Sequence, residues 1–324
     1  MTNIAFLMDP IDSLNLKKDS TLAMIKEAQL RNLKVYYFTL GDLVVRQNRP
    51  YAKFRVLTLS DPFLNNMDDP STSGNWYKLE EEKELPLDSM QVIMMRKDPP
   101  FDLEYIYATY YLERAEEHGA LVVNKPASLR DCNEKFFATA FSELTPELVI
   151  SRNTNILKDF FFEHSDVIFK KLDGMGGKSI FRVKKEDSNL NVILETLTEN
   201  NQIQIMGQKY IPEIIDGDKR ILMIDGEPVP WALARIPAAG ESRGNLAAGG
   251  TGKGQMLSER DKEIANQIGP QLKAKGLTFV GIDVIGDYLT EINVTCPTCI
   301  RELDKQFETN IAGQLIDCIL LKLP

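Results

Sequence analysis

The chain contains little cysteine and histidine, and this scarcity argues against several kinds of site. Its 324 residues include four cysteines and two histidines. Four cysteines are too few for a disulfide framework, and a structural zinc site needs four Cys or His ligands. Cys296 and Cys299 form a Cys-x-x-Cys pair without a second pair nearby. We interpret them as packing or substrate-loop residues, with a redox pair as the alternative.

The chain also lacks an excess of positive charge and a long apolar run. It carries 38 basic and 47 acidic residues, for a net charge of -9, whereas a nucleic-acid partner requires a basic face. No stretch approaches the roughly 20 apolar residues of a membrane span, and the first residues do not resemble a signal peptide. We therefore expect a cytoplasmic protein that binds neither nucleic acid nor membranes.

The order of predicted elements indicates an α/β protein with more than one domain. Residues 3–38 read as a βαβ unit, with a helix-start signal at Asp19. Further strands are predicted at 91–95 and 120–123. Beyond about residue 131 strands and helices alternate differently, so we place the first domain boundary there.

The segment 281–294 predicts two apolar strands joined by a Gly-Asp turn. Side chains alternate along a strand, so Glu291 and Asn293 face the same way, and Asp283 reaches across from the partner strand. Such a sparse set of oxygen ligands favours Mg²⁺ with nucleotide phosphates. The alternative is a solvated acidic edge. A two-residue turn would pair Asp283 with residue 290 instead of Glu291, so we expect an odd-numbered loop.

Glycines and lysines upstream predict a phosphate-binding hairpin. Gly174, Gly176 and Gly177 stand between two predicted strands, where glycine lets backbone N–H groups approach phosphate oxygens. The segment lacks the spacing of a P-loop or a dinucleotide fingerprint, and a plain β-turn is the alternative. Lys135 and Lys170 flank it, and two lysines near a Mg²⁺ site would neutralise a triphosphate. Snorkelling surface lysines are the alternative.

Charged residues mark the ends of two later strands. Asp218 and Arg220 begin one predicted strand, and Arg235 ends the next. Arginine is suited to bidentate recognition of carboxylates and phosphates. Surface charge at strand ends is the alternative.

A loop rich in glycine and alanine follows at 236–254. Long loops without regular structure are usually lids or disordered segments. This one carries Arg243 and Asn245 at its centre, so we interpret it as a lid.

Taken in order, these residues resemble the ATP-grasp ligases, and longer motifs narrow the resemblance to the bacterial glutathione synthetases. The motifs extend along nearly the whole chain: Met8-Asp9-Pro10, Lys17-Lys18-Asp19-Ser20, Arg96-Lys97-Asp98-Pro99-Pro100-Phe101, Asn124-Lys125-Pro126, Leu172-Asp173-Gly174-Met175-Gly176-Gly177, Arg243-Gly244-Asn245-Leu246-Ala247-Ala248-Gly249-Gly250 and Glu291-Ile292-Asn293-Val294-Thr295. Lys171 and Cys296 depart from the family pattern, which has proline and serine there.

The resemblance implies an α/β architecture in which an ATP-grasp fold follows an N-terminal Rossmann-like domain. The N-terminal domain would span 1–131, the small ATP-grasp unit 132–209 and the large unit 210–324. The implied reaction joins γ-glutamylcysteine to glycine through an acyl phosphate, with ATP and Mg²⁺ (or Mn²⁺), giving glutathione, ADP and phosphate. The implied assembly is a homotetramer. Another ATP-grasp carboxylate-amine ligase, or a non-catalytic nucleotide-binding protein of this fold, is the alternative.

The resemblance also implies roles for individual residues. ATP would be bound by Lys135, Lys170, Gly174, Gly176, Gly177, Gln208, Lys209, Tyr210, Ile211 and Asp218, and the metal by Asp283, Glu291 and Asn293. The peptide substrate would contact Asp19, Ser20, Arg96 and Asp98. The reacting carboxylate and its developing charge would be met by Arg220, Arg235, Arg243 and Asn245.

Overall fold

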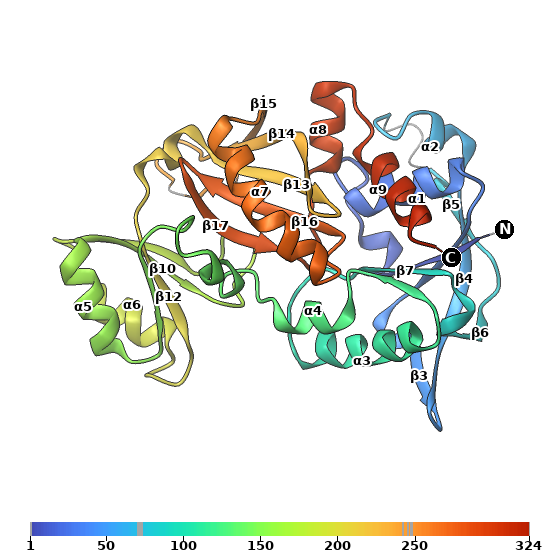
Figure 1. Ribbon diagram of the computed structural model, residues 1–324, viewed down its shortest axis with the longest axis horizontal. Helices are drawn as coiled ribbons and strands as arrows, with labels where there is room; N and C mark the ends of the chain where they lie inside the picture. Colours follow the sequence, from blue (N-terminus) through green and yellow to red (C-terminus); the bar gives the residue numbers. More distant parts are fainter. Residues whose placement is uncertain (1, 70–73, 242, 245, 247–248, 324) are drawn as a thin grey trace.

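Three β-sheets follow one another along the molecule (Figure 1). A computed structural model describes residues 2–69, 74–241, 243–244, 246 and 249–323. The first sheet is built from strands within 3–123, the second from 148–209 and the third from 218–293. No helix in the described part of the chain is long and apolar enough to cross a membrane.

The first sheet has a parallel centre. In the described residues its strands are β1 (Asn3–Met8), β2 (Lys34–Phe38), β3 (Leu43–Arg46), β4 (Arg49–Leu59), β5 (Tyr77–Leu79), β6 (Lys83–Pro86), β7 (Val92–Arg96) and β8 (Leu121–Val123). The order is β3-β4-β2-β1-β7-β8, and β5 and β6 also pair with β4. Strands β2, β1, β7 and β8 are parallel to one another.

Helices cover both faces of this sheet, which explains the continuous apolar run of β1. Ile4 and Phe6 pack with α1 (Ser20–Leu30), whereas Ala5 and Leu7 face the opposite way and pack with α3 (Leu103–Glu117). Helix α1 begins as expected at Asp19, whose Oδ1 accepts a hydrogen bond from the Leu22 N–H at 2.9 Å. Shorter helices are α2 (Asp61–Asn65), α4 (Pro126–Asp131), and the 3-10 turns η1 (Ile11–Ser13), η2 (Leu40–Asp42) and η4 (Leu87–Ser89).

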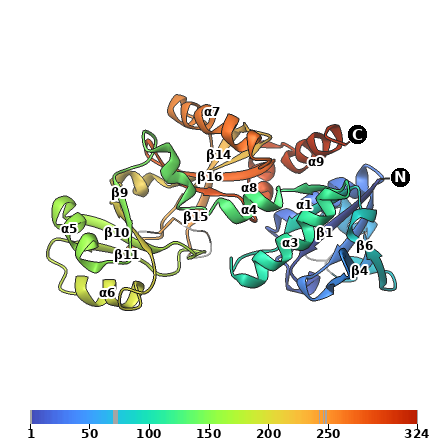
Figure 2. The same cartoon turned by 60° about the horizontal axis from the view of Figure 1, so that its bottom comes forward.

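The second sheet is a small antiparallel unit at one end of the molecule. Its order is β11 (Ile180–Lys184), β10 (Asp166–Lys171), β12 (Ile205–Lys209) and β9 (Leu148–Ser151). Figure 2 shows α5 (Thr154–His164) and α6 (Leu190–Leu197) covering it, and the core between them contains Phe161 and Phe169. The predicted glycine hairpin joins β10 to β11, so it projects from the end of this unit. The 3-10 turn η5 (Phe137–Phe141) precedes the unit.

The third sheet is antiparallel throughout and is covered on both faces. Its order is β15 (Thr251–Met256), β14 (Glu227–Ile236), β13 (Asp218–Ile224), β16 (Phe279–Ile285) and β17 (Tyr288–Asn293), and η6 (Pro212–Asp216) leads into it. Helix α7 (Glu259–Ala274) lies on one face. Helices α8 (Ile300–Phe307) and α9 (Ile311–Leu321) lie on the other and also pack against α1 (Figure 1). The end of the chain therefore returns to the first sheet.

The hairpin between β16 and β17 has a shorter turn than expected. Ile285 pairs with Tyr288, so Gly286 and Asp287 form a two-residue turn and the predicted odd-numbered loop is wrong. Gly286, in this turn, has φ +55°. Outside the hairpin, Cys299 also has a positive φ, +86°. A positive φ is readily adopted by glycine, so the Gly-Asp sequence suits a tight hairpin turn.

A β-bulge nevertheless restores the expected pairing of Asp283 with Glu291. The register shifts beside Asp283, and Thr290 is the extra residue on β17. The Thr290 hydroxyl donates a hydrogen bond to the Asp283 carbonyl oxygen at 3.1 Å. A two-residue turn alone would direct the side chains of Asp283 and Glu291 to opposite faces of the sheet. Because the bulge adds one residue to β17, it brings them back to the same face.

Helix α7 approaches the turn between β13 and β14 at a pair of glycines. A Cβ on Gly269 would overlap the carbonyl oxygen of Gly226. We expect Gly269→Ala to lower the free energy of unfolding by about 1–3 kcal/mol, because overpacking strains both backbones. Urea unfolding followed by circular dichroism measures the change. Gly41→Ala is the control, because a Cβ there meets nothing nearer than 3.9 Å. Equal unfolding midpoints would show that α7 shifts without strain.

Candidate active site

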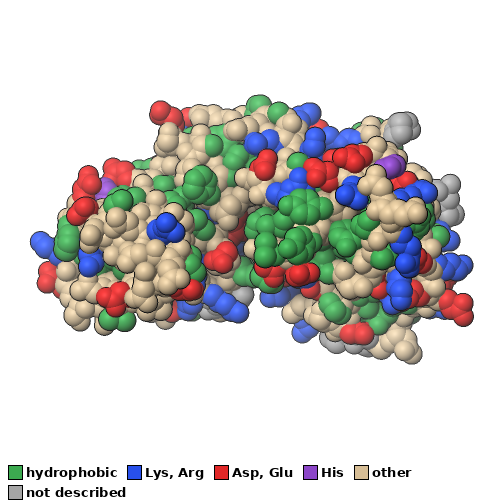
Figure 3. Space-filling view, turned by 90° about the horizontal axis from the view of Figure 1, so that it is seen from below, with side chains coloured by type: hydrophobic (Ala, Val, Ile, Leu, Met, Phe, Trp, Pro, Cys, Tyr) green, Lys and Arg blue, Asp and Glu red, His purple; other side chains and the backbone are tan. Residues whose placement is uncertain are grey.

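A cavity of about 520 Å³ lies where the three sheets meet, and Figure 3 shows the surface hollowed beside the small unit. The cavity brings together most of the predicted site residues: Asp19, Ser20, Arg96, Asp98, Lys170, Gly174, Gly176, Gly177, Gln208, Tyr210, Ile211, Asp218, Arg220, Arg243, Asp283, Glu291 and Asn293. Lys135, Lys209 and Arg235 do not line it. Asn245 lies outside the described residues.

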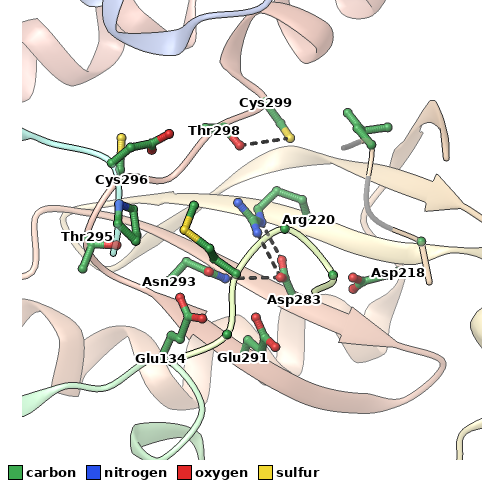
Figure 4. A pocket seen from close by; sticks show the side chains of 18 of the residues that line it. Glu134, Asp218, Arg220, Asp283, Glu291, Asn293, Thr295, Cys296, Thr298 and Cys299 are labelled. Atoms are coloured by element: carbon green, nitrogen blue, oxygen red, sulfur yellow. Dashed lines mark hydrogen bonds and ion pairs between the residues drawn. The ribbon is translucent and has the colours of Figure 1, made fainter. Parts of the chain in front are cut away.

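Asp283 is the centre of a buried network of charges (Figure 4). Arg220 donates to its two oxygens from Nε at 2.5 Å and Nη2 at 2.9 Å, and Arg235 Nη2 lies 2.9 Å from Oδ2. The amide of Asn293 donates to Oδ2 at 3.2 Å. Burial raises the pKa of the Asp283 carboxyl, but the two guanidinium groups outweigh burial and hold it well below its ordinary value.

One of the two carboxylate oxygens of Asp218 is buried but not satisfied by the described residues. Its Oδ2 is paired with Arg235, whereas its Oδ1 is buried without a hydrogen-bond partner in the described residues. Burial raises the pKa of Asp218 to about 6, and Arg235 only partly opposes that shift. An unpaired buried oxygen on a cavity wall marks a position where a ligand hydroxyl or a metal-bound water would be stabilised.

Two buried lysines share the carboxylate of Glu291. Lys135 Nζ and Lys170 Nζ each lie 3.5 Å from its Oε1, and Lys135 also contacts Glu134 at 2.5 Å and the Gly174 carbonyl oxygen at 2.7 Å. Burial by itself would lower the pKa of both lysines. For Lys135 the carboxylates of Glu291 and Glu134 outweigh burial and raise the pKa, whereas for Lys170 burial prevails and the pKa is lowered.

Glu134 is a cavity residue that the sequence analysis missed. The sequence offered one signal for it: Glu134 is adjacent to Lys135, and the two side chains form an ion pair in the structure. Burial, and then repulsion from Glu291, raises the pKa of Glu134. The amide of Asn133 donates to the Leu172 carbonyl oxygen at 3.1 Å. The segment 133–135 therefore supports the base of the glycine hairpin.

The side-chain oxygens on β16 and β17 fit a hard cation that also binds oxygens of another molecule, such as phosphates. In Figure 4, Asp283, Glu291 and Asn293 lie around one part of the cavity. Asn293 directs its amide N–H groups to Gly281 and Asp283, which leaves its amide oxygen as a ligand. The described residues contain no group of three or more His, Cys, Asp or Glu suited to a metal. Two carboxylates and one amide oxygen match Mg²⁺ that is shared with phosphates.

The predicted lid is shorter than the segment 236–254. Residues from Thr251 onward form β15, in which Gly252 and Gly254 pair with β14, so that part of the prediction is wrong. Glycine-rich composition concealed an edge strand, because backbone pairing requires no side chain. Arg243 Nη1 donates to the Gly177 carbonyl oxygen at 3.2 Å, so the loop meets the glycine hairpin.

The segment after β12 carries an unforeseen aromatic contact. The guanidinium carbon of Arg182 lies 3.3 Å from the ring centroid of Tyr210, and Asp166 holds the same guanidinium at 2.9 Å and 2.7 Å. Gln208 is buried in the cavity, whereas Lys209 points away to Glu147 at 3.3 Å. The side chain of Lys209 is therefore outside the site.

The first domain contributes a polar wall to the cavity. Arg96 donates to the Thr21 hydroxyl at 3.1 Å and to the Pro297 carbonyl oxygen at 2.9 Å. Cys296 Sγ donates to the Arg96 carbonyl oxygen at 3.4 Å. Burial raises the pKa of the Cys296 and Cys299 thiols, which disfavours the thiolate that redox exchange requires. The pair therefore behaves as packing and wall residues here.

Comparisons with known proteins agree along the whole chain. The family described as "Prokaryotic glutathione synthetase, N-terminal domain" matches residues 2–130, and "Prokaryotic glutathione synthetase, ATP-grasp domain" matches residues 134–308. A glutathione synthetase of Pseudomonas aeruginosa is 57% identical over 320 residues, covering 99% of this chain and 98% of the relative. One of Citrobacter rodentium is 55% identical over 323 residues, covering 100% and 99%.

Solved structures share the fold at low identity. D-cycloserine synthetase DcsG superposes with a TM-score of 0.67 at 12% identity, covering 99% of this chain and 100% of that one. ATP-grasp ligase PsnB, complexed with minimal precursor, Mg and ADP, gives 0.61 at 15% identity, covering 98% and 97%. These likenesses confirm the expected ATP-grasp fold.

Asp283 is the carboxylate on which Arg220 is held, and Arg235 shares it with Asp218. We expect Asp283→Asn to lower the free energy of unfolding by about 3–5 kcal/mol, because it leaves the buried Arg220 without its carboxylate partner. Glu291→Gln is the matched control on the paired strand, and we expect a smaller loss because its lysine contacts are 3.5 Å long. Urea unfolding at neutral pH measures both. Equal losses would contradict a special structural role for Asp283.

Proposed function

The chain belongs to the prokaryotic glutathione synthetase family and is an ATP-dependent ligase of the ATP-grasp fold, and on that premise we propose how its cavity joins γ-glutamylcysteine to glycine. The observation that carries the proposal is the meeting of three groups in one cavity: the glycine hairpin, Glu291 with Lys170, and Asp283 with Arg220. Lys135 and Arg235 contact the same two carboxylates from outside the cavity lining. Identity of 55–57% along the whole chain favours this reaction over another carboxylate-amine ligation or nucleotide binding alone.

The reaction requires an activated carboxylate. A carboxylate is a poor electrophile, so the γ-phosphoryl group of ATP passes to the cysteinyl carboxylate and gives an acyl phosphate. The glycine amine then attacks the acyl carbon, and phosphate leaves with the electrons of the broken C–O bond. Phosphoryl transfer depends on positioning and charge neutralisation, which the cavity is built to supply.

The nucleotide lies between the small unit and the third sheet in this proposal. Lys135 and Lys170 exchange Glu291 for phosphate oxygens, and the hairpin at 174–177 covers the phosphates with backbone N–H groups. The chain at 208–211 borders the adenine, and Asp218 uses its unpaired Oδ1 on the ribose or metal side. Mg²⁺, when bound by Asp283, Glu291 and Asn293, neutralises charge on the transferring phosphoryl group.

Of the two arginines on Asp283, Arg220 lines the cavity and faces the reacting carboxylate, whereas Arg235 acts through the carboxylates that it holds. Within the described residues, Arg220 uses Nε and Nη2 for its hydrogen bonds to Asp283, which leaves its Nη1 for a ligand. Fixed N–H donors aimed at developing negative charge stabilise a transition state without reorganisation. The peptide then extends toward Arg96, Asp98, Asp19 and Ser20.

Three finer features belong to the same proposal. Mn²⁺ replaces Mg²⁺ at the same oxygen ligands, since both are hard cations. The assembly is a homotetramer, and the enzyme works in the cytoplasm, where ATP is supplied.

The reaction is tested by measuring ADP, phosphate and tripeptide with each substrate alone and with both together. We expect one ADP and one phosphate for each tripeptide formed, and little phosphate without γ-glutamylcysteine. Glu291→Gln should reduce ligation by at least about 100-fold with the fold retained, because the carboxylate serves phosphates and metal. Tripeptide formation unchanged in Glu291→Gln would contradict its proposed role, and none in the parent protein would contradict the function.

Arg243 links the loop to the glycine hairpin, and we expect Arg243→Ala to uncouple ATP use from ligation. A loosened loop admits water to the acyl phosphate, so phosphate release should exceed tripeptide formation when glycine is limiting. Both products are measured in one tube at limiting and saturating glycine. Lys253→Ala is the control, because it lies in β15 beyond the loop. If both yields fall in parallel, Arg243 serves binding or phosphoryl transfer instead.

A further inference from the structure

Asn124 is a buried residue whose side-chain amide joins two segments of the third sheet. It directly follows β8 of the first domain and is 4% exposed. Its Nδ2 donates to the carbonyl oxygens of Phe279 and Val294 at 2.7 Å each, and its Oδ1 accepts from the Phe279 N–H at 2.8 Å. These bonds use both amide protons and one lone pair of the oxygen. Asn124 is not among the described residues that line the cavity, so any effect on the site passes through its partners.

The amide of Asn124 takes the place of a further residue of β17. Strand β16 begins at Phe279, whereas β17 ends at Asn293, which pairs with Gly281. An antiparallel neighbour of Phe279 would exchange N–H and C=O hydrogen bonds with it. Asn124 makes both of those bonds, and its second amide proton holds the carbonyl oxygen of Val294. The side chain therefore fixes the point at which the chain leaves β17.

That point lies one residue beyond Asn293, a proposed metal ligand. The Asn293 amide donates to the Gly281 carbonyl oxygen and to Asp283 Oδ2, at 3.2 Å each. Both distances are at the long end of the hydrogen-bond range, so the direction of this amide depends also on where its backbone is held. Val294, the next residue, is 1% exposed and is held by Asn124.

Two neighbouring contacts fasten the same segment to the chain before β16. The Lys125 N–H donates to the Gly276 carbonyl oxygen at 3.1 Å, and the Ser128 hydroxyl donates to the Lys275 carbonyl oxygen at 2.5 Å. Neither of these two contacts reaches β17, whereas Asn124 holds Val294 at its end. Anchoring of the segment and control of β17 are therefore separable by substitution.

We propose that Asn124 is a positioning residue for the metal site, which holds the end of β17 so that the side-chain oxygen of Asn293 faces the divalent cation. This assignment rests on the proposed metal ligands of the ligase. The end of the first sheet thereby takes part in setting the geometry of the third sheet's ligands. Residues that orient a ligand in this way typically change metal affinity about 10–100-fold when they are replaced.

Binding of Mn²⁺ in the presence of ADP tests the assignment without turnover, because ADP has no γ-phosphoryl group to transfer. The electron paramagnetic resonance signal of unbound Mn²⁺ is followed during titration of the full-length parent protein, Asn124→Asp, Asn124→Ser and Asn293→Ala at one ADP concentration. Asn124→Asp removes both amide donors and keeps an acceptor. Asn124→Ser leaves room for water and is the milder variant, which decides the question if Asn124→Asp does not fold.

Ser128→Ala is the matched control, because it removes a neighbouring contact of the same segment without reaching β17. We expect both Asn124 variants to bind Mn²⁺ about 10-fold more weakly than the parent protein, and Ser128→Ala to stay within about twofold of it. The thermal midpoint should fall in all three variants. The Mg²⁺ concentration that half-saturates ligation should rise with the loss of Mn²⁺ affinity, while the KM for glycine stays unchanged.

Parent-like Mn²⁺ affinity in a folded Asn124 variant would overturn the assignment. An equal loss in Ser128→Ala would also overturn it, because that result would show a general loosening of the segment. Asn293→Ala reports on the metal site itself. If Asn293→Ala bound Mn²⁺ as the parent protein does, or if the parent protein with ADP bound none, the proposed metal site would be overturned and the role of Asn124 with it. The two failures are therefore distinguishable.

Discussion

The site depends on one buried carboxylate, that of Asp283, held between two arginines. An isolated charge at this depth would be strongly unfavourable, and its pairing with Arg220 and Arg235 makes all three tolerable. Arg220 is held on Asp283 through Nε and Nη2, and Arg235 is held on Asp218 through the same two nitrogens, so the direction of both guanidinium groups is fixed. A cavity for a carboxylate and phosphates needs such fixed cations, since mobile ones would lose conformational entropy on binding. Stability and function therefore rest on the same contacts here.

The bulge at Thr290 shows how local backbone geometry serves this network. The hairpin adopts the two-residue turn that its Gly-Asp sequence favours, which by itself would direct Glu291 to the opposite face. One inserted residue cancels that shift. The Thr290 hydroxyl pairs with the Asp283 carbonyl oxygen, so the bulge is satisfied by its own side chain. The sheet thereby combines a tight turn with the pairing of Asp283 and Glu291.

Sequence reasoning predicted those features that depend on local pattern. The strand at 3–8 and the helix cap at Asp19 follow from the apolar run and from capping chemistry. The pairing of Asp283 with Glu291 was also expected, but it arises from the bulge and not from the odd-numbered loop that strand alternation required. It missed features that depend on tertiary neighbours. Strand β15 is an edge strand with two glycines among its six residues, which weaken the strand signal, and Glu134 becomes a site residue because the fold brings it into the cavity. The resemblance to a family supplied the substrates, which periodicity could not.

The pKa values of the two lysines are shifted in opposite directions, which agrees with the proposed binding of metal and nucleotide side by side. Both lysines rely on Glu291, but Lys135 has Glu134 as a second carboxylate while Lys170 has burial and the repulsion of Lys135 against it. Lys170 is therefore the less well compensated cation, and phosphate oxygens would favour its charged form. If phosphates take the lysines, Glu291 loses its partners and becomes an unpaired buried anion beside Asp283. A divalent cation at Glu291 would remove that penalty, so in the proposed mechanism each ligand would improve the site for the other, as reciprocal coupling requires.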